Sequence, residues 1–321
     1  CTDSQHYMDI ARDWYLSDGE WDRLVQLVFL PGYPVVVRLF SYLTGDCLAA
    51  GLFVSALCFA GSGVMLYKLM CLDMESAAAL RAVKFFALCP AAFFFAAPMS
   101  ESLFVLCTVS CLYLVRTGRI RTGDLLGAYA AFTRSPGLIL VVPILFELVR
   151  SRAKPREYLA LFMVPLGFAA YCMINYSVSG DAFKFMEYQS IHWHQQLGWF
   201  FGTAAYQLQY FLSSLNTGEA AMGLTLFLPN LICCLAGLII LALSAGKLRP
   251  SYAAYGLLYY AVTVGCTWLL SGPRYLAVCF PIAAGLCALV KGRLPRRILA
   301  LLSLIMMLMY MWAYVLGYSV Y

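Results

Sequence analysis

Long apolar segments occupy most of the chain and follow a polar first part. Their approximate bounds are 47–67, 82–98, 102–116, 124–149, 157–177, 222–246, 252–270, 275–290 and 297–317, with a weaker stretch at 198–215. A bilayer accepts only helices and closed barrels, and no alternating strands are visible, so apolar runs of about 20 residues predict membrane-spanning helices. The pattern predicts an all-α polytopic membrane protein whose transmembrane domain, residues 47–321, holds about ten membrane segments.

Residues 1–46 form the one long segment without membrane character. Apolar and aromatic residues recur at helical spacing from Tyr7 to Tyr15, which predicts a short helix lying at the membrane interface. A second apolar run, Val35–Leu43, is too short to span a bilayer. We therefore expect an extracytoplasmic first loop with interfacial helices.

Composition agrees with a membrane protein. Apolar residues make up 63% of the chain and charged residues 12%, and mean hydropathy is +0.78, which excludes an ordinary soluble domain. Most of the 13 cysteines lie inside apolar runs, where they act as small hydrophobes rather than as a disulfide framework. No strong metal-ligand set is visible, so no cofactor is assigned and dependence on a divalent metal stays open.

The basic residues lie between the apolar segments. Five connecting regions, near residues 68–84, 116–121, 150–156, 247–249 and 291–297, hold 16 of the 22 Lys and Arg residues. The positive-inside rule makes these regions cytoplasmic. The net charge of +6 is thus read as a topology signal, and no nucleic-acid partner is expected.

Segment 124–149 has basic residues at both ends, which one membrane crossing would place on opposite sides. In its middle, Thr133–Gly137 reads Thr-Arg-Ser-Pro-Gly, and Pro and Gly are strong helix breakers. We therefore expect a broken-helix hairpin that turns around Arg134 on the outer side and lines a cavity.

Two acidic residues are candidates on that outer side. Asp3 precedes the expected interfacial helix, so it is either a helix N-cap or a functional carboxylate. Glu101 stands at a helix start, where a carboxylate favours the positive helix end, and a structural role is the simpler interpretation.

Basic and aromatic residues make up the other candidates. Arg134 sits beside a helix break within an apolar segment, which favours a functional role. Arg274 lies in a tight turn, and it either acts at the site or extends its guanidinium group to the lipid headgroups. For Arg38, contact with the lipid headgroups is the simpler interpretation. His192 and Trp193 belong to the outer loop 178–221, where interfacial packing is the alternative.

A carboxylate, arginines and aromatic groups above apolar walls suit a reaction on a lipid-linked phosphate. Guanidinium groups bind phosphate and stabilise the charge that develops on it as it leaves. A carboxylate can accept the proton of an attacking hydroxyl group.

Six short motifs, in this order, resemble those of the PIG-V type mannosyltransferases, which belong to the GT-C glycosyltransferases. They are Asp3–Ala11, Leu30–Pro34, Pro90–Phe94 with Ser100–Ser102, Thr133–Gly137, Gly180–Phe183 with His192–Trp193, and Pro273–Tyr275. Thr2 stands where the family has a tryptophan, and the span that precedes this loop in the family is not in the sequence, so we expect that the native N-terminus is missing.

The resemblance implies a GT-C helical bundle and an inverting transfer of mannose, or another hexose, from a polyprenyl- or dolichyl-phosphate sugar. In such an enzyme we expect Asp3, which matches the family motif, to be the base and Arg134 and Arg274 to bind the donor phosphate. We expect Glu101, His192, Trp193 and Arg38 to lie around the substrates. The eukaryotic family member acts on the glycosylphosphatidylinositol precursor in the endoplasmic reticulum. Short loops and compact length favour a bacterial cell membrane here, with a glycolipid, a polymer or a protein as acceptor.

Two other classes of protein remain open. A lipid or solute transporter or flippase would also be polytopic, although no internal repeat is found and the charged groups gather at one mouth. A non-catalytic subunit of a membrane transferase would retain its function without Asp3.

Overall fold

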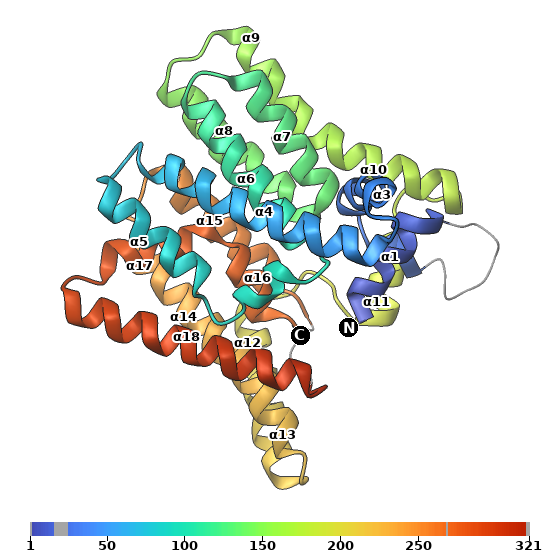
Figure 1. Ribbon diagram of the computed structural model, residues 1–321, viewed down its shortest axis with the longest axis vertical. Helices are drawn as coiled ribbons and strands as arrows, with labels where there is room; N and C mark the ends of the chain where they lie inside the picture. The colour runs from blue at the N-terminus through green and yellow to red at the C-terminus, as the bar shows by residue number, and fades with distance from the viewer. Residues whose placement is uncertain (1, 16–24, 268, 319–321) are drawn as a thin grey trace. The chain divides into compact units, whose positions relative to one another are not determined.

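The structure, a computed structural model, describes residues 2–15, 25–267 and 269–318 (Figure 1). Within these ranges the chain forms helices and helical turns, and one isolated β-bridge, between Leu197 and Cys266, but no strand. The chain divides into two compact units, residues 1–69 with 94–194 and residues 70–93 with 195–321. The predicted all-α class is confirmed.

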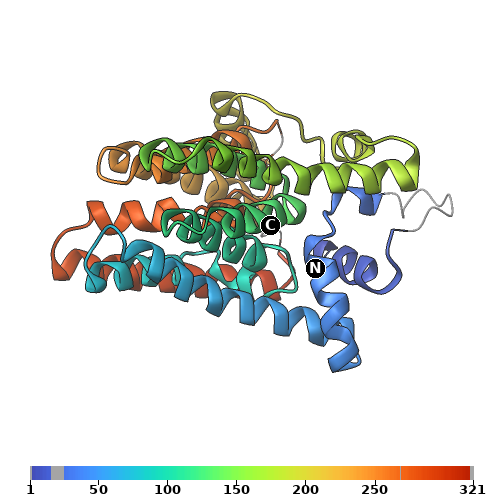
Figure 2. The same ribbon diagram turned by 90° about the horizontal axis from the view of Figure 1, so that it is seen from above.

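The first unit is built around α7. Its helices are α1 (Thr2–Asp13), η1 (Val25–Val28), α3 (Gly32–Thr44), α4 (Cys47–Met70), α6 (Glu101–Arg116), α7 (Ile120–Thr133), η3 (Ser135–Leu140), α8 (Val141–Arg150), α9 (Pro155–Tyr158), η4 (Leu159–Phe162), α10 (Met163–Ser179) and α11 (Lys184–Trp193). Helix α7 packs on α6 and on α10, and Gly61 of α4 faces Leu106 of α6. Figure 2 shows α4, the α6–α7 pair and α10 as successive layers of this unit.

The second unit is built around α14. Its helices are α5 (Ser76–Ala87), α12 (Phe200–Asn216), α13 (Ala220–Met222), the π-helical turn η5 (Gly223–Phe227), α14 (Leu228–Ser244), α15 (Pro250–Val264), α16 (Gly272–Val278), α17 (Phe280–Leu289) and α18 (Arg293–Val315); η2 (Ala92–Ala96) lies where the chain returns to the first unit. Helix α14 packs against α15, α16 and α17. Apolar residues including Cys234, Leu241, Tyr260 and Leu269 form the core between these helices.

Four of the described helical segments are long and apolar enough to cross a membrane. They are Cys47–Met70, Pro155–Ser179, Ala220–Ser244 and Arg293–Val315. Helices α16 and α17, which meet at an angle of 76°, together form either a broken fifth span or a re-entrant loop. These five agree with predicted segments. Other predicted segments are shorter helices: α5 ends at Ala87 within segment 82–98, and α6 has 16 residues. The predicted number of about ten membrane segments stays a prediction.

The first loop is helical on both sides of residues 16–24, which lie outside the described residues. Helix α1 buries Tyr7 and Ile10 and exposes Arg12, as its spacing predicts. The helix ends earlier than its aromatic pattern suggests, because Trp14 adopts a left-handed backbone conformation with φ of +67°. Helix α3 is the short second helix expected here, and Gly45, with φ of +74°, ends it.

Candidate active site

The expected break in segment 124–149 is present. Helix α7 ends at Thr133, Arg134 is extended (φ −150°, ψ 137°), and η3 follows with Pro136 in its first turn. A Cβ atom on Gly137 would lie 2.4 Å from the backbone nitrogen of Ala131, so η3 folds back against α7 in a contact that only glycine permits. The chain therefore reverses at Arg134, as the sequence predicted.

Arg134 forms a buried ion pair with Glu101. Its Nη1 atom lies 2.6 Å from Oε1 of Glu101 and 3.1 Å from Oγ of Ser100. The Glu101 side chain is 1% exposed and that of Arg134 is 11% exposed. A buried ion pair is tolerated when each charge has a partner of good geometry, so Glu101 holds the guanidinium group in place. This contact gives Glu101 a position beside Arg134; whether it also touches a sugar stays a prediction.

Helix α1 joins this pair through a hydroxyl contact. The Tyr7 hydroxyl lies 2.9 Å from Oγ of Ser100, the same atom that accepts a hydrogen bond from Arg134. Residues three and four positions apart share a helix face, so His6 and Tyr7 lie on the face of α1 that carries Asp3. The sequence reasoning missed His6 and Tyr7, although they stand within the motif that contains Asp3.

Asp3 lies in the first turn of α1 rather than in front of the helix. Asp3 is therefore not the N-cap of α1, and the N-cap interpretation was wrong. The Asp3 carboxylate acts electrostatically on His6: burial lowers the pKa of His6 below its usual value, and the charges of Asp3 and Asp9 oppose that effect. Asp3 therefore lies close to His6.

An aromatic cluster, which we define as His6, Tyr7, Phe29 and Trp193, lies next to the Ser100 contact. His6 stacks on Phe29 with ring centroids 4.7 Å apart, and the edges of Tyr7 and Trp193 meet Phe29 at 5.2 and 5.8 Å. His192 contacts Trp193 at 5.9 Å. The structure thus connects His192 and Trp193, two predicted residues far along the chain, to the helix that carries Asp3.

Two of the sequence motifs meet at the start of α3. The Tyr129 hydroxyl donates to the Gly32 carbonyl at 2.8 Å, and a Cβ on Gly32 would lie 2.4 Å from Oγ1 of Thr133. The motif Leu30–Pro34 is therefore packed against the residue that precedes Arg134. Arg38 lies further along α3, half-buried, and is not among the residues that meet at the Arg134 ion pair.

Arg274 belongs to the second unit, so a site shared with Arg134 stays a prediction. It lies in α16, 7% exposed, with its guanidinium group 5.9 Å from the ring centroid of Tyr275. Burial argues against the lipid-headgroup interpretation. The predicted tight turn is also corrected, because α15 ends at Val264 and α16 begins at Gly272, which leaves a longer non-helical break.

Polar side chains from neighbouring helices satisfy the backbone of that break. Thr203 donates to the carbonyl of Cys266 at 2.7 Å, and Gln207 to that of Leu269 at 2.5 Å. Asn230 donates to the Leu270 carbonyl at 3.2 Å and accepts from the Gly272 amide at 2.7 Å. Non-helical backbone in an apolar layer requires such partners. Thr203, Gln207 and Asn230 are polar residues within the predicted apolar segments 198–215 and 222–246. They were the sequence signal for these contacts with the break, and the sequence reasoning missed that signal.

Among the described residues, no group of three His, Cys, Asp or Glu side chains could hold a metal ion. His192 lies in the last turn of α11. His194 follows the end of that helix and has a left-handed backbone conformation, with φ of +52°.

Comparison with known proteins identifies the family. Residues 2–189, more than half of the chain, match the family model described as Mannosyltransferase (PIG-V). The chain belongs to the PIG-V mannosyltransferase family. The matched region contains Asp3, Arg38, Glu101 and Arg134 and ends before Arg274.

Similar proteins of known name are mammalian. Human GPI alpha-1,6-mannosyltransferase 2 is 33% identical over 150 residues, which are 43% of this chain and 29% of the human protein. The mouse protein of the same name is 32% identical over 148 residues, with the same coverage. The aligned region thus spans less than a third of the length of these relatives. They do not support the expectation of a bacterial membrane.

A solved structure shares the fold. The chain resembles ArnT from Cupriavidus metallidurans, in a crystal structure with bound undecaprenyl phosphate, with a TM-score of 0.51 at 15% identity, over 89% of this chain and 55% of that protein. The fold is therefore that of a GT-C helical bundle, and the protein is a multi-pass membrane protein. Fold and family together do not favour the transporter alternative.

Proposed function

We propose that this protein is a membrane glycosyltransferase that transfers mannose, or another hexose, from a polyprenyl- or dolichyl-phosphate sugar to an acceptor hydroxyl group. The observation that carries the proposal is the buried Arg134–Glu101 pair, joined through Ser100 and Tyr7 to the helix of Asp3 in the matched region of a mannosyltransferase family. The undecaprenyl phosphate bound to ArnT supports a donor of the lipid-phosphate class.

Asp3 is proposed as the general base. The acceptor oxygen forms a bond to C1 of the sugar while the bond from C1 to the phosphate oxygen breaks, and the acceptor proton passes to the Asp3 carboxylate. The lipid phosphate leaves with the bonding electrons. A single displacement of this kind inverts the configuration at C1.

Arg134 is proposed to bind the donor phosphate. A guanidinium group stabilises the charge that grows on the leaving phosphate, most strongly where water is excluded. Glu101 keeps this group oriented, and Arg274 of the second unit is proposed as the second phosphate ligand.

The remaining predicted residues are proposed to surround the substrates. His192 and Trp193 extend the aromatic cluster next to Asp3, and aromatic faces suit the apolar side of a sugar ring. Arg38, half-buried on α3, is likewise proposed to contact the substrates. The acceptor is a glycolipid, a polymer or a protein, and the name of the human relative favours a glycolipid.

The test measures transfer of radiolabelled mannose from polyprenyl-phosphate mannose to lipid, polymer and protein acceptors. Membranes carry the complete protein, its Asp3→Asn form or its Asp13→Asn form at matched expression. Loss of a general base lowers rates about 10²–10⁴-fold, so we expect Asp3→Asn to remove transfer. Asp13 is the matched control, since it lies on the same helix with its side chain 52% exposed, and its variant should transfer normally.

Two results would contradict the proposal. Equal transfer by the wild type and Asp3→Asn would remove Asp3 from the mechanism. Wild-type transfer no greater than that of empty membranes would reject this donor.

A further inference from the structure

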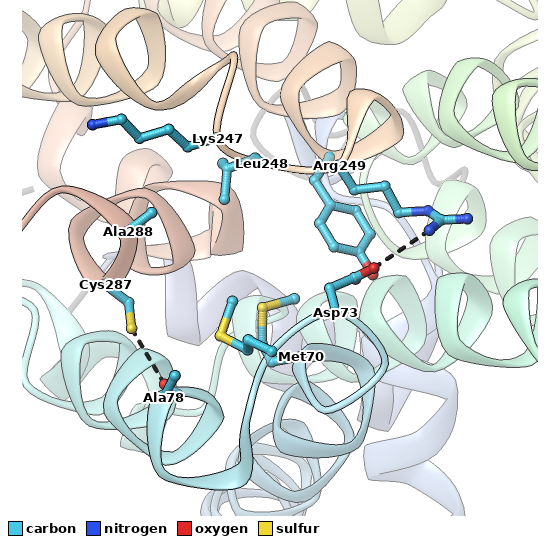
Figure 3. Close-up of a pocket in the computed structure, with 10 residues that line it drawn as sticks. Met70, Asp73, Ala78, Lys247, Leu248, Arg249, Cys287 and Ala288 are labelled. Carbon is cyan, nitrogen blue, oxygen red and sulfur yellow. Dashed lines mark hydrogen bonds and ion pairs between the residues drawn. The ribbon is translucent and has the colours of Figure 1, made fainter.

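A pocket of about 230 Å³ lies in the second unit, and its lining includes none of the residues of the proposed site. It is lined by Met70, Asp73, Met74, Ala78, Lys247, Leu248, Arg249, Tyr252, Cys287 and Ala288. Figure 3 shows that three segments build it: the connection from α4 to α5, the connection from α14 to α15, and the end of α17.

The pocket lies at the ends of two candidate membrane spans. Met70 is the last residue of the span Cys47–Met70, and Lys247 follows the span Ala220–Ser244 by three residues. An apolar helix that crosses a bilayer ends at the level of the lipid headgroups. The pocket is therefore placed where headgroups lie, at the face that the positive-inside rule makes cytoplasmic.

The charges in the pocket sum to one positive charge. Nη1 of Arg249 lies 3.3 Å from Oδ1 of Asp73, with both side chains partly exposed. Lys247 and Arg249 extend in opposite directions from their loop (Figure 3), so the Asp73 carboxylate neutralises Arg249 and not Lys247. Lys247 is exposed to solvent.

The charged residues that stand close in sequence to the lining residues are mostly basic. Lys68 stands two residues before Met70, Lys291 and Arg293 follow the end of α17, and Glu75 is the acidic neighbour of Met74. The remaining lining is apolar and includes two methionines, whose flexible side chains adapt to varied partners.

We propose that this pocket binds the phosphate headgroup of an anionic phospholipid from the surrounding membrane. Lys247, the lining cation that Asp73 does not neutralise, would form charge-assisted hydrogen bonds with the phosphate oxygens. The apolar lining would accept the glycerol region and the first methylene groups of the chains. Basic pockets between transmembrane helices on the cytoplasmic side are suited to such headgroups. The proposal does not depend on the glycosyltransferase activity.

The experiment measures bound lipid by native mass spectrometry. The purified full-length protein is mixed with equal amounts of phosphatidylglycerol and phosphatidylcholine, and the bound fraction of each is counted. The wild type should retain phosphatidylglycerol in preference. One basic residue near an anionic surface changes binding about five-fold, so Lys247→Gln should lower phosphatidylglycerol binding by that factor.

Two further variants define the charge effect. Asp73→Asn removes the acidic side chain of the lining, which makes the net charge of the pocket more positive, and should raise phosphatidylglycerol binding. Lys84→Gln is the matched control, because Lys84 is an exposed lysine of α5 in the same unit that does not line the pocket, and it should leave binding unchanged. Normal elution of each variant in size-exclusion chromatography shows that it folds.

Several outcomes would overturn the proposal. Equal retention of the two lipids, equal effects of Lys247→Gln and Lys84→Gln, or weaker binding by Asp73→Asn would each reject it. A final arm adds inorganic phosphate. Failure of millimolar phosphate to displace the lipid supports a lipid ligand, whereas displacement that Lys247→Gln prevents would identify free phosphate as the ligand instead.

Discussion

At the scale of single residues, the Arg134 guanidinium and the Glu101 carboxylate neutralise each other in a place that is almost closed to water. Breaking a buried ion pair costs more than the pair itself contributes, because the remaining charge stays buried without its counter-charge. The two residues are thus energetically coupled, and their individual substitutions report on one interaction.

Arg134→Met should lower the free energy of unfolding by about 3–5 kcal/mol, since it leaves the Glu101 carboxylate buried opposite an apolar group. Denaturant unfolding of the protein in detergent measures this change. The double variant Arg134→Met with Glu101→Gln should lose less than the sum of the single variants. Arg12→Met is the control: Arg12 pairs with Asp9 but is 57% exposed, and its loss should cost at most about 1 kcal/mol. An equal cost at Arg12 and Arg134 would show that burial of the pair has no energetic effect.

Tyr7→Phe removes the hydroxyl that joins α1 to Ser100. We expect a loss of about 1 kcal/mol of stability, as for one buried hydrogen bond, and a lower kcat for transfer because α1 positions Asp3. Ser100→Ala removes this contact and the one to Arg134. The double variant Tyr7→Phe with Ser100→Ala should therefore have the same stability as Ser100→Ala alone. Tyr260→Phe removes a comparable 2.9 Å bond, to the Cys234 carbonyl in the second unit, and should lower stability without lowering kcat. Additive effects of Tyr7→Phe and Ser100→Ala would contradict a shared contact.

At the scale of elements, the two non-helical breaks are held in different ways. The break at Arg134 depends on close backbone packing, with η3 against α7. The break between α15 and α16 depends on side chains of α12 and α14 that bond its carbonyl and amide groups. Both satisfy the rule that irregular backbone within an apolar layer is covered by protein.

Gly137→Ala should open the first break. Its Cβ would meet backbone atoms, which cannot rotate away as a side chain can, so we expect a loss of about 1–3 kcal/mol and reduced transfer. Thermal unfolding and the mannose-transfer assay measure the two effects. Gly202→Ala in α12 is the control, because no atom lies within 4 Å of its added Cβ, and it should be neutral or slightly stabilising. Equal behaviour of the two variants would refute the close packing of η3.

At the scale of the whole molecule, the distribution of basic residues predicts which ends of the spans face the cytoplasm. Helix α4, with 24 residues, is about 36 Å long and can cross a hydrocarbon core of about 30 Å. Native cysteines lie near its two ends: Cys47 begins the helix, and Cys71, which is exposed, follows it.

A membrane-impermeant thiol reagent should therefore label Cys71 from the cytoplasmic side and Cys47 from the opposite side. Cys71→Ser and Cys47→Ser identify each labelled site by mass spectrometry. Labelling of both cysteines from one side would show that α4 does not cross the membrane, and labelling of Cys71 only from outside would invert the topology.

Hydropathy and local spacing determined the all-helical class, the positions of α4, α14 and α18, the short helices of the first loop, and the turn at Arg134. These properties follow from neighbours in sequence, because an apolar run, a Pro-Gly pair or a helical repeat acts over a few residues. Six ordered motifs were enough to suggest the family, which the comparison with known proteins confirmed.

Only the tertiary structure decided which polar groups meet. The contact between Tyr7 and Ser100 joins residues 93 positions apart, and the Asn230 side chain satisfies a backbone 40 positions away. The end of α15 at Val264 likewise depends on partners in other helices, so the apolar run to residue 270 misleads. A buried polar atom needs a partner in space and not in sequence, and the folded chain alone supplies it.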